Sequence, residues 1–128
     1  MKKEAKRYAI TDAVADRIYV SILQKLLVER RYRDPNYTEA MLSREIRCSA
    51  RYITQVLKDR TGGSYSQLVN SYRLRDARRM LRTPRYADYT VEEIGIECGY
   101  ASRQAFYVAF GREMGMTPRQ YRKMNHGE

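Results

Sequence analysis

Two segments of the sequence carry polar side chains of the kinds that recognise other molecules by hydrogen bonding. In residues 102–114, Phe106 and Phe110 fall on one apolar face of a predicted helix. The opposite face carries Arg103, Gln104, Tyr107, Val108, Gly111 and Arg112. Arginine can donate two parallel hydrogen bonds to guanine O6 and N7, and glutamine can pair with adenine N6 and N7. The candidate chemistry of this face is therefore recognition of base edges.

A second segment, residues 49–60, repeats this arrangement nearer the N-terminus. Its apolar face consists of Ile53, Val56 and Leu57. Its opposite face presents Arg51, Thr54, Gln55 and Lys58. A merely solvated surface is the alternative for each of these polar side chains, because long polar residues usually face water.

Sequence signals before residue 103 predict the elements that position the second polar face. Thr90 can cap a helix, and Glu93 three residues later can complete a capping box. Gly99 suits a left-handed turn, and Ser102 can cap the helix that follows. Two helices joined by a tight turn, the second with exposed polar side chains, describe a helix-turn-helix.

The chain contains the same unit twice. Six positions match at an offset of 53 residues: Ser49 with Ser102, Ile53 with Phe106, Leu57 with Phe110, Gly62 with Gly115, Ser64 with Thr117, and Leu68 with Tyr121. Leu42 with Ile94 and Ile46 with Cys98 match at an offset of 52, which places one extra residue, Ala101, in the second turn. A solenoid also repeats, but two copies are too few for a stable stack.

The remaining segments predict an all-α fold of about seven helices. A first helix runs from Thr11 or Asp12 to about Arg31, and a turn follows at residues 34–36. Further helices cover about 38–46 and 64–82, and Thr117-Pro118 begins a last short one. The expected buried positions of the long helix are Leu68, Tyr72, Leu74, Ala77 and Leu81.

These elements divide the chain into a tail or severed linker, residues 1–10, and one domain, residues 11–128. Within the domain, subdomains of about 11–63 and 83–123 are joined by the linker helix of about 64–82. At 1.5 Å per residue that helix spans about 27 Å. Successive major-groove faces of B-DNA recur about every 34 Å. One chain can therefore meet two adjacent turns of a duplex, at a site that need not be a palindrome.

The charge balance narrows the choice of partner. Lys and Arg number 25 against 15 acids, a formal net charge of +10, and 19 of the 25 basic residues are arginine. Such an excess favours a polyanion. A membrane surface is the other anionic candidate, but no long helix is basic on one side and apolar on the other. No signal peptide or membrane span is apparent, which indicates an intracellular protein.

Sequence signals for catalysis are weak. The one histidine, His126, lies near the C-terminus, and no nucleophile elbow, glycine-rich phosphate loop or metal-ligand spacing occurs. Cys48 and Cys98 are expected to be small buried apolar residues rather than a disulfide. We expect no enzyme activity, no metal and no cofactor.

The second unit resembles the signature of the AraC/XylS family of bacterial transcription regulators. In that signature a glycine-aromatic turn precedes serine, then F-x-x-x-F, then G-x-T-P-x-x-Y-R. The matching residues are Gly99, Tyr100, Ser102, Phe106, Phe110, Gly115, Thr117, Pro118, Tyr121 and Arg122. The stretch LVNSYRLRDARRMLR resembles the family's linker helix through Arg73, Ala77 and Leu81. The resemblance covers about Ile22 to Lys123 and implies sequence-specific binding of double-stranded DNA by a transcription regulator, expected to be an activator.

Three positions depart from the family pattern. Gly95 stands where alanine is usual in a tight helix contact, Arg47 replaces a common glycine in the first turn, and Gly111 replaces a frequent lysine. The first two are expected to loosen a helix contact. The linker-helix arginines Arg73, Arg75, Arg78 and Arg79 are further candidates for phosphate contact, with ion pairs to Asp76, Glu92 or Glu93 as the alternative for several of them. Arg73 is expected to be structural.

The resemblance also implies which residues touch DNA, because family members place the first half of each recognition helix in a major groove. The residues then expected at base edges are Arg51, Thr54, Gln55, Arg103, Gln104, Tyr107 and Val108. Tyr107 can instead stack on the protein itself. Expected phosphate contacts are Lys58, Arg112 and the helix starts at Thr38 and Thr90.

Further partners follow from the family alone. Contact with RNA polymerase is implied, without any residue that identifies the surface.

An RNA-binding or protein-interaction module is the alternative function. The 12 tyrosines can stack on bases, although most fall at core or turn positions. A small-molecule effector would act only through a separate sensor domain, and this domain is expected to touch no membrane. The chain is expected in the bacterial cytoplasm, on the nucleoid. It is either a stand-alone regulator or the C-terminal part of a longer protein. The stretches KRYAIT and YRDPNYT resemble the junction region of longer family members and favour the second alternative.

Overall fold

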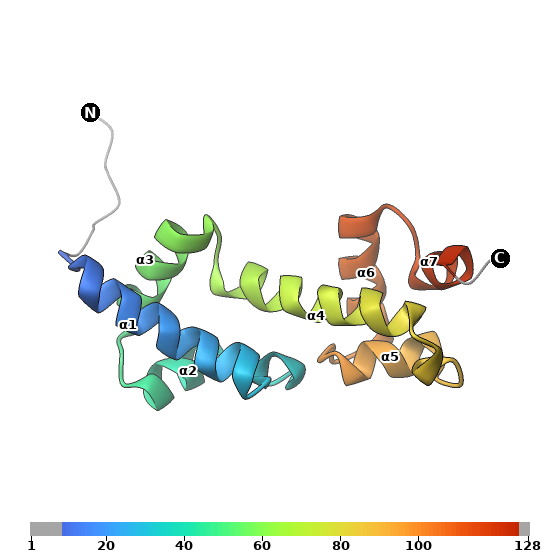
Figure 1. The fold of residues 1–128 in the computed structure, drawn as a ribbon, viewed down its shortest axis with the longest axis horizontal. Helices are drawn as coiled ribbons and strands as arrows, with labels where there is room; N and C mark the ends of the chain where they lie inside the picture. The colour runs from blue at the N-terminus through green and yellow to red at the C-terminus, as the bar shows by residue number, and fades with distance from the viewer. Residues whose placement is uncertain (1–8, 126–128) are drawn as a thin grey trace.

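The computed structural model describes residues 9–125, and its elements there are helical (Figure 1). The α-helices are α1 (Asp12–Leu23), α2 (Glu39–Ile46), α3 (Ala50–Thr61), α4 (Tyr65–Arg82), α5 (Val91–Glu97), α6 (Arg103–Met114) and α7 (Pro118–Asn125). Short connections are the π-helical η1 (Gln24–Val28) and the 3₁₀ turns η2 (Arg31–Arg33) and η3 (Pro84–Tyr86). The predicted all-α fold of about seven helices is confirmed. Most of the predicted tail, and His126, lie outside the described residues.

The first helix ends earlier than predicted. Its start is correct, since the Thr11 hydroxyl accepts a hydrogen bond from the Val14 N–H at 3.2 Å. Its last turn widens into the π-helical η1, and Arg30 then takes a left-handed backbone with φ of 56°. The apolar spacing continues through Leu26, which is buried in η1. Such spacing does not distinguish an α-helical from a π-helical turn, so the prediction ran past the end of the helix.

Each helix of the repeated units begins at a side-chain cap. The hydroxyl oxygens of Thr38, Ser49, Ser64, Thr90 and Ser102 each accept a hydrogen bond from the backbone N–H three residues on, at 3.0–3.3 Å. The predicted capping box at Thr90 is complete, because Glu93 accepts a hydrogen bond from the Thr90 N–H at 2.8 Å. Helix α5 starts 52 residues after α2, and α6 starts 53 after α3, so the extra residue lies in the second turn as predicted.

Two clusters of buried side chains follow one another along the chain. The first joins α1, α2, α3 and the N-terminal part of α4, and includes Ile22 and Leu42. The second joins the C-terminal part of α4 with α5, α6 and α7, and includes Phe106 and Phe110. Helix α4 therefore contributes to both cores. Neither α4 nor any other helix in residues 9–125 combines the length and apolar character needed to cross a bilayer.

The buried face of α4 changes along the helix. Leu74, Ala77 and Leu81 are buried as predicted, but Leu68 and Tyr72 are only half-buried. The other apolar side chains that α4 buries are Tyr65, Val69 and Met80. The expectation that Leu68 and Tyr72 are buried was wrong, because the N-terminal part of α4 packs into one core and its C-terminal part into another.

The carboxylate of Asp76 binds the first unit to the middle of α4. Asp76 is buried and accepts hydrogen bonds from the Tyr32 hydroxyl and from Arg33, whose Nη2 lies 2.7 Å away. Arg79 pairs with it at 3.4 Å, which confirms that a linker-helix arginine pairs with a nearby acid. Burial acts to raise the pKa of Asp76, but the hydrogen bonds from Tyr32 and Arg33 hold that pKa below its ordinary value.

Arg73 and Gly99 close the same junction. The Arg73 Nε donates a hydrogen bond to the Tyr32 carbonyl oxygen at 2.6 Å, and its guanidinium lies 5.7 Å from the Tyr100 ring centroid. Arg73 is structural, as predicted. Gly99 has φ of 112°, and a Cβ there would lie 2.4 Å from the Tyr32 carbonyl oxygen. The turn of the second unit therefore packs directly against η2 of the first.

The departures at Gly95 and Arg47 do not loosen the helix contacts, contrary to expectation. A Cβ at Gly95 would lie 2.4 Å from the Phe106 ring, so glycine lets α5 and α6 approach closely. Arg47 takes a left-handed backbone with φ of 56°, and its N–H still donates to the Ser43 carbonyl oxygen. The end of α2 is thus preserved, although this backbone is strained for a residue with a side chain.

Helices α3 and α6 lie on the same side of α4, one near each end (Figure 1). Helices α2 and α5 lie on the other side in this view. With 18 residues, α4 is about 27 Å long. The fold therefore presents two similar helices at a separation set by a single helix.

Candidate nucleic-acid interface

The polar face of α6 is organised by a carboxylate from α5. Glu92 Oε2 accepts hydrogen bonds from Arg103 Nε at 3.1 Å and from the Tyr107 hydroxyl at 3.1 Å. Arg119 of α7 forms an ion pair with the same oxygen at 3.5 Å. The Arg103 guanidinium also lies 4.5 Å from the Tyr107 ring centroid. Two of the predicted base-contacting side chains are thus held next to each other.

The contact between Glu92 and Arg103 favours the charged form of both side chains. The backbone N–H of Glu92 and the Arg103 guanidinium hold the pKa of the Glu92 carboxyl below its ordinary value. The hydrogen bond to Glu92 in turn raises the pKa of Arg103. The Arg103 side chain is 64% exposed and that of Glu92 is 29% exposed. Arg103 is therefore the member of the pair that an incoming ligand would meet first.

Gln104 and Val108 form a neighbouring strip on α6. Both are exposed, and they border an open hollow of about 720 Å³ between α6 and the N-terminal half of α4. Ser66 and Asn70 belong to its α4 wall. A ligand lying against this strip would also meet polar side chains of α4.

In the first unit, a side chain of α3 also donates a hydrogen bond to a carboxylate of the preceding helix. Thr54, which corresponds to Tyr107 in the repeat, donates a hydrogen bond to the Glu39 carboxylate at 3.1 Å. Arg51 and Thr54 are exposed, and Gln55 is half-buried. In both units a carboxylate from the first turn of the preceding helix thus binds this position of the second helix.

The predicted phosphate contacts lie at the edges of the two units. Lys58 and Arg112 are exposed on α3 and α6, one turn beyond the predicted base-reading residues. Thr38 and Thr90 cap α2 and α5 through their hydroxyl groups. The first backbone N–H groups of a helix have no partner within the helix, so such positions suit an anion.

Three residues beside this interface, Glu92, Arg119 and Lys123, were not expected there from the sequence. Arg119 and Lys123 of α7 line an open hollow of about 660 Å³ together with Thr90 and Glu92. Arg119 and Lys123 are four residues apart, so their common face of a helix was visible in the sequence. The neighbour of that face depends on how α7 packs against α4 and α6, which the spacing does not reveal.

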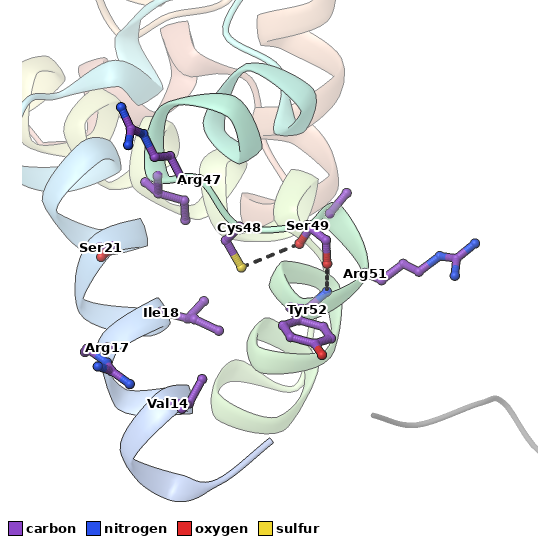
Figure 2. Close-up of a pocket in the computed structure, with 11 residues that line it drawn as sticks. Val14, Arg17, Ile18, Ser21, Arg47, Cys48, Ser49, Arg51 and Tyr52 are labelled. Atoms are coloured by element: carbon purple, nitrogen blue, oxygen red, sulfur yellow. Dashed lines mark hydrogen bonds between the residues drawn. The ribbon is translucent and has the colours of Figure 1, made fainter. Parts of the chain in front are cut away.

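A further hollow of about 970 Å³ lies between α1 and the α2–α3 turn (Figure 2). Val14 and Ile18 contribute apolar side chains, Cys48 points into it, and Arg51 points away from it (Figure 2). Cys48 and Cys98 are free thiols rather than a disulfide. Cys98 is buried as expected, whereas Cys48 is half-buried. Burial raises the pKa of the Cys48 thiol, which therefore stays protonated near neutral pH.

Comparison with known proteins places these features in a family. A family model described as a helix-turn-helix domain matches residues 42–124, well over half of the chain. The HTH-type transcriptional activator RhaR of Escherichia coli strain K12 is 35% identical over 81 residues, which cover 63% of this chain and 28% of RhaR. The chain thus spans less than a third of the length of the curated relatives it matches.

Solved structures share the fold. The DNA-binding domain of the transcriptional factor AdpA, in complex with a target DNA, superposes with a TM-score of 0.71 at 24% identity and covers 88% of this chain and 93% of that one. A Chromobacterium violaceum transcriptional regulator, described as an AraC-type DNA-binding domain-containing protein, has a TM-score of 0.72 at 18% identity and covers 89% and 96%. Taken together with the match over residues 42–124 and the doubled helix-turn-helix, these likenesses show that the chain belongs to the AraC/XylS family and carries its DNA-binding domain.

Proposed function

We propose that this domain binds double-stranded DNA at specific sequences and regulates transcription, with α3 and α6 in adjacent segments of the major groove. The observation that carries the proposal is the placement of α3 and α6 on one side of α4, near its two ends (Figure 1). The length of α4, about 27 Å, approaches the groove repeat of about 34 Å once the widths of the helices are added. The segments of about 11–63 and 83–123 would then act as subdomains on a shared helix.

The proposal divides the interface into two kinds of contact. Base edges would be read by Arg51, Thr54, Gln55, Arg103, Gln104, Tyr107 and Val108. Phosphates would be held by Thr38, Lys58, Thr90 and Arg112. Exposure of Arg103, Gln104 and Val108 on one side of α6 supports this division. The net charge of +10 supports an approach to a polyanion.

Activation of transcription is the regulatory outcome that we propose. RhaR carries the name of a transcriptional activator, and this chain resembles a part of it. Activation would require a contact with RNA polymerase, which we assign to no particular residue. Any response to a small molecule would belong to a sensor domain in a longer protein.

Selection of bound duplexes from a random pool tests the proposal. The selected duplex, a scrambled duplex and an RNA of the same sequence are then titrated at several salt concentrations. We expect the selected duplex to bind about a thousandfold more tightly than the scrambled one. The logarithm of the association constant should fall with log salt by about 0.9 per phosphate contact. A flat salt response, or equal affinity for all three nucleic acids, would contradict the proposal.

A further inference from the structure

We propose that Glu92 is a positioning residue for sequence readout: it holds Arg103 in the orientation that reads a base and keeps it from binding phosphates indiscriminately. This inference rests on the proposed function and deepens it. Glu92 lies on α5, outside the recognition helix, and was not among the residues expected to touch DNA. Its carboxylate nevertheless has partners on both α6 and α7.

The contacts leave Arg103 suited to one mode of binding. Glu92 accepts the hydrogen bond of Arg103 Nε, and the guanidinium carbon of Arg103 lies over the Tyr107 ring, 4.5 Å from its centroid. A guanidinium carries two further NH₂ groups at its end. A guanidinium that is held through Nε and placed over an aromatic ring presents this end as a pair of parallel donors, the geometry that guanine O6 and N7 accept. Tyr107 is fixed by the same carboxylate through its hydroxyl.

Charge argues that Glu92 has a role other than raising affinity. A carboxylate at this surface is repelled by phosphates, and it partly neutralises both Arg103 and Arg119. Without it, two mobile arginines would be available to any duplex, whatever its sequence. Release of Arg119 would strengthen binding to every duplex alike, whereas the hold on Arg103 keeps that arginine for base readout and so raises the ratio of specific to non-specific affinity.

The variant Glu92→Gln tests this inference with two readouts. In binding, the duplex selected by the wild-type chain and its scrambled version are titrated at several salt concentrations. We expect affinity for the scrambled duplex to rise and its salt dependence to steepen by about 0.9 per additional phosphate contact. The ratio of selected to scrambled affinity should fall about tenfold, within the range of one bidentate base contact.

Glu97→Gln is the matched control, because Glu97 is an exposed acid on the same helix. It removes the same charge and should leave the affinity ratio unchanged. In the background of Arg103→Ala, Glu92→Gln should also leave the ratio unchanged, since the effect acts through Arg103. A ratio that is unaltered by Glu92→Gln, or altered equally by Glu97→Gln, would overturn the inference.

A measurement without DNA separates the inference from the proposed function. Nitrogen-15 NMR of the arginine side chains should show an Arg103 Nε–H that exchanges slowly in the wild-type chain and in Glu97→Gln, and rapidly in Glu92→Gln. If this signal behaves as expected but no duplex is bound, the proposed function alone fails. If duplexes are bound selectively but the Arg103 signal is the same in all three proteins, the positioning role of Glu92 fails.

Discussion

Arg103 and Arg112 lie on the same helix and carry the same charge, but their surroundings differ. Arg103 is held between Glu92 and Tyr107, whereas Arg112 is exposed one turn beyond the predicted base-reading residues. A side chain that contacts a base edge contributes affinity only on the right sequence, whereas a phosphate contact contributes on every sequence. A comparison of these two arginines therefore separates base readout from general electrostatic attraction.

We expect Arg103→Ala and Gln104→Ala each to lower affinity for the selected duplex by about tenfold to a hundredfold, with little effect on a scrambled duplex. Fluorescence anisotropy titrations of both duplexes measure this difference. Arg112→Ala is the control, since it should weaken both duplexes by the same factor and reduce the salt slope by about 0.9. Equal losses on both duplexes in Arg103→Ala would show that Arg103 contacts only the phosphate backbone.

At the scale of secondary-structure elements, the junction between η2, α4 and the α5–α6 turn determines how the two units are oriented. Arg73 and Asp76 of α4 both bind residues of η2, and Gly99 of the second turn packs against the same segment. A change at this junction should therefore affect stability and the relative placement of α3 and α6 together.

Gly99→Ala should lower the free energy of unfolding by about 3 kcal/mol. The left-handed backbone contributes about 1–2 kcal/mol of this cost, and displacement of η2 by the added Cβ contributes the rest. Gly62→Ala is the matched control, because Gly62 is also left-handed but a Cβ there meets nothing within 4 Å. It should cost only about 1 kcal/mol. Urea unfolding curves measure both costs. If Gly99→Ala and Gly62→Ala lowered the free energy of unfolding equally, the close contact between Gly99 and η2 would contribute nothing to the cost.

Asp76→Asn should lower the free energy of unfolding by about 1–3 kcal/mol at neutral pH, because the buried acceptor for Tyr32 and Arg33 loses its charge. The pKa of Asp76 is lower in the folded than in the unfolded chain, so its contribution is complete at neutral pH. That contribution is lost as the pH falls below about 4, the ordinary range of aspartate.

The difference in stability between the wild-type chain and Asp76→Asn should consequently shrink between pH 7 and pH 3. Urea unfolding at a series of pH values measures it, with Asp88→Asn, at an exposed aspartate, as the control. A difference that stays constant over this range would show that the charge of Asp76 contributes nothing.

Local signals in the sequence predicted the elements well because both the caps and the apolar spacing act within a few residues. Thr90, Ser102 and Gly99 all behave in the structure as their residue types suggested. Apart from the end of the first helix, the errors concern contacts between distant segments. The buried face of α4 depends on two cores, and the partnership of Glu92 with Arg119 depends on where α7 packs. Neither can be obtained from the spacing of residues within one helix.

At the scale of the whole molecule, α4 is the element on which the proposed function depends. It contributes to both hydrophobic cores and carries α3 and α6 on the same side (Figure 1). Because the contacts of Asp76, Arg73 and Gly99 brace the middle of α4, we expect α3 and α6 to keep a fixed separation. A flexible tether would allow many spacings between the two parts of a DNA site, whereas a braced helix allows one.

A spacing series on the selected duplex tests this central claim most directly. Insertions of 5 and 10 base pairs are placed between the two major-groove segments that α3 and α6 would contact, and the affinity of each duplex is measured by titration at one salt concentration. We expect both insertions to reduce affinity to that of a single segment. The first rotates one segment away from the protein, and the second moves it about 34 Å beyond the reach of α4. Full affinity at the 10-base-pair insertion, or no loss at 5 base pairs, would contradict the claim that one rigid chain reads two adjacent turns of DNA.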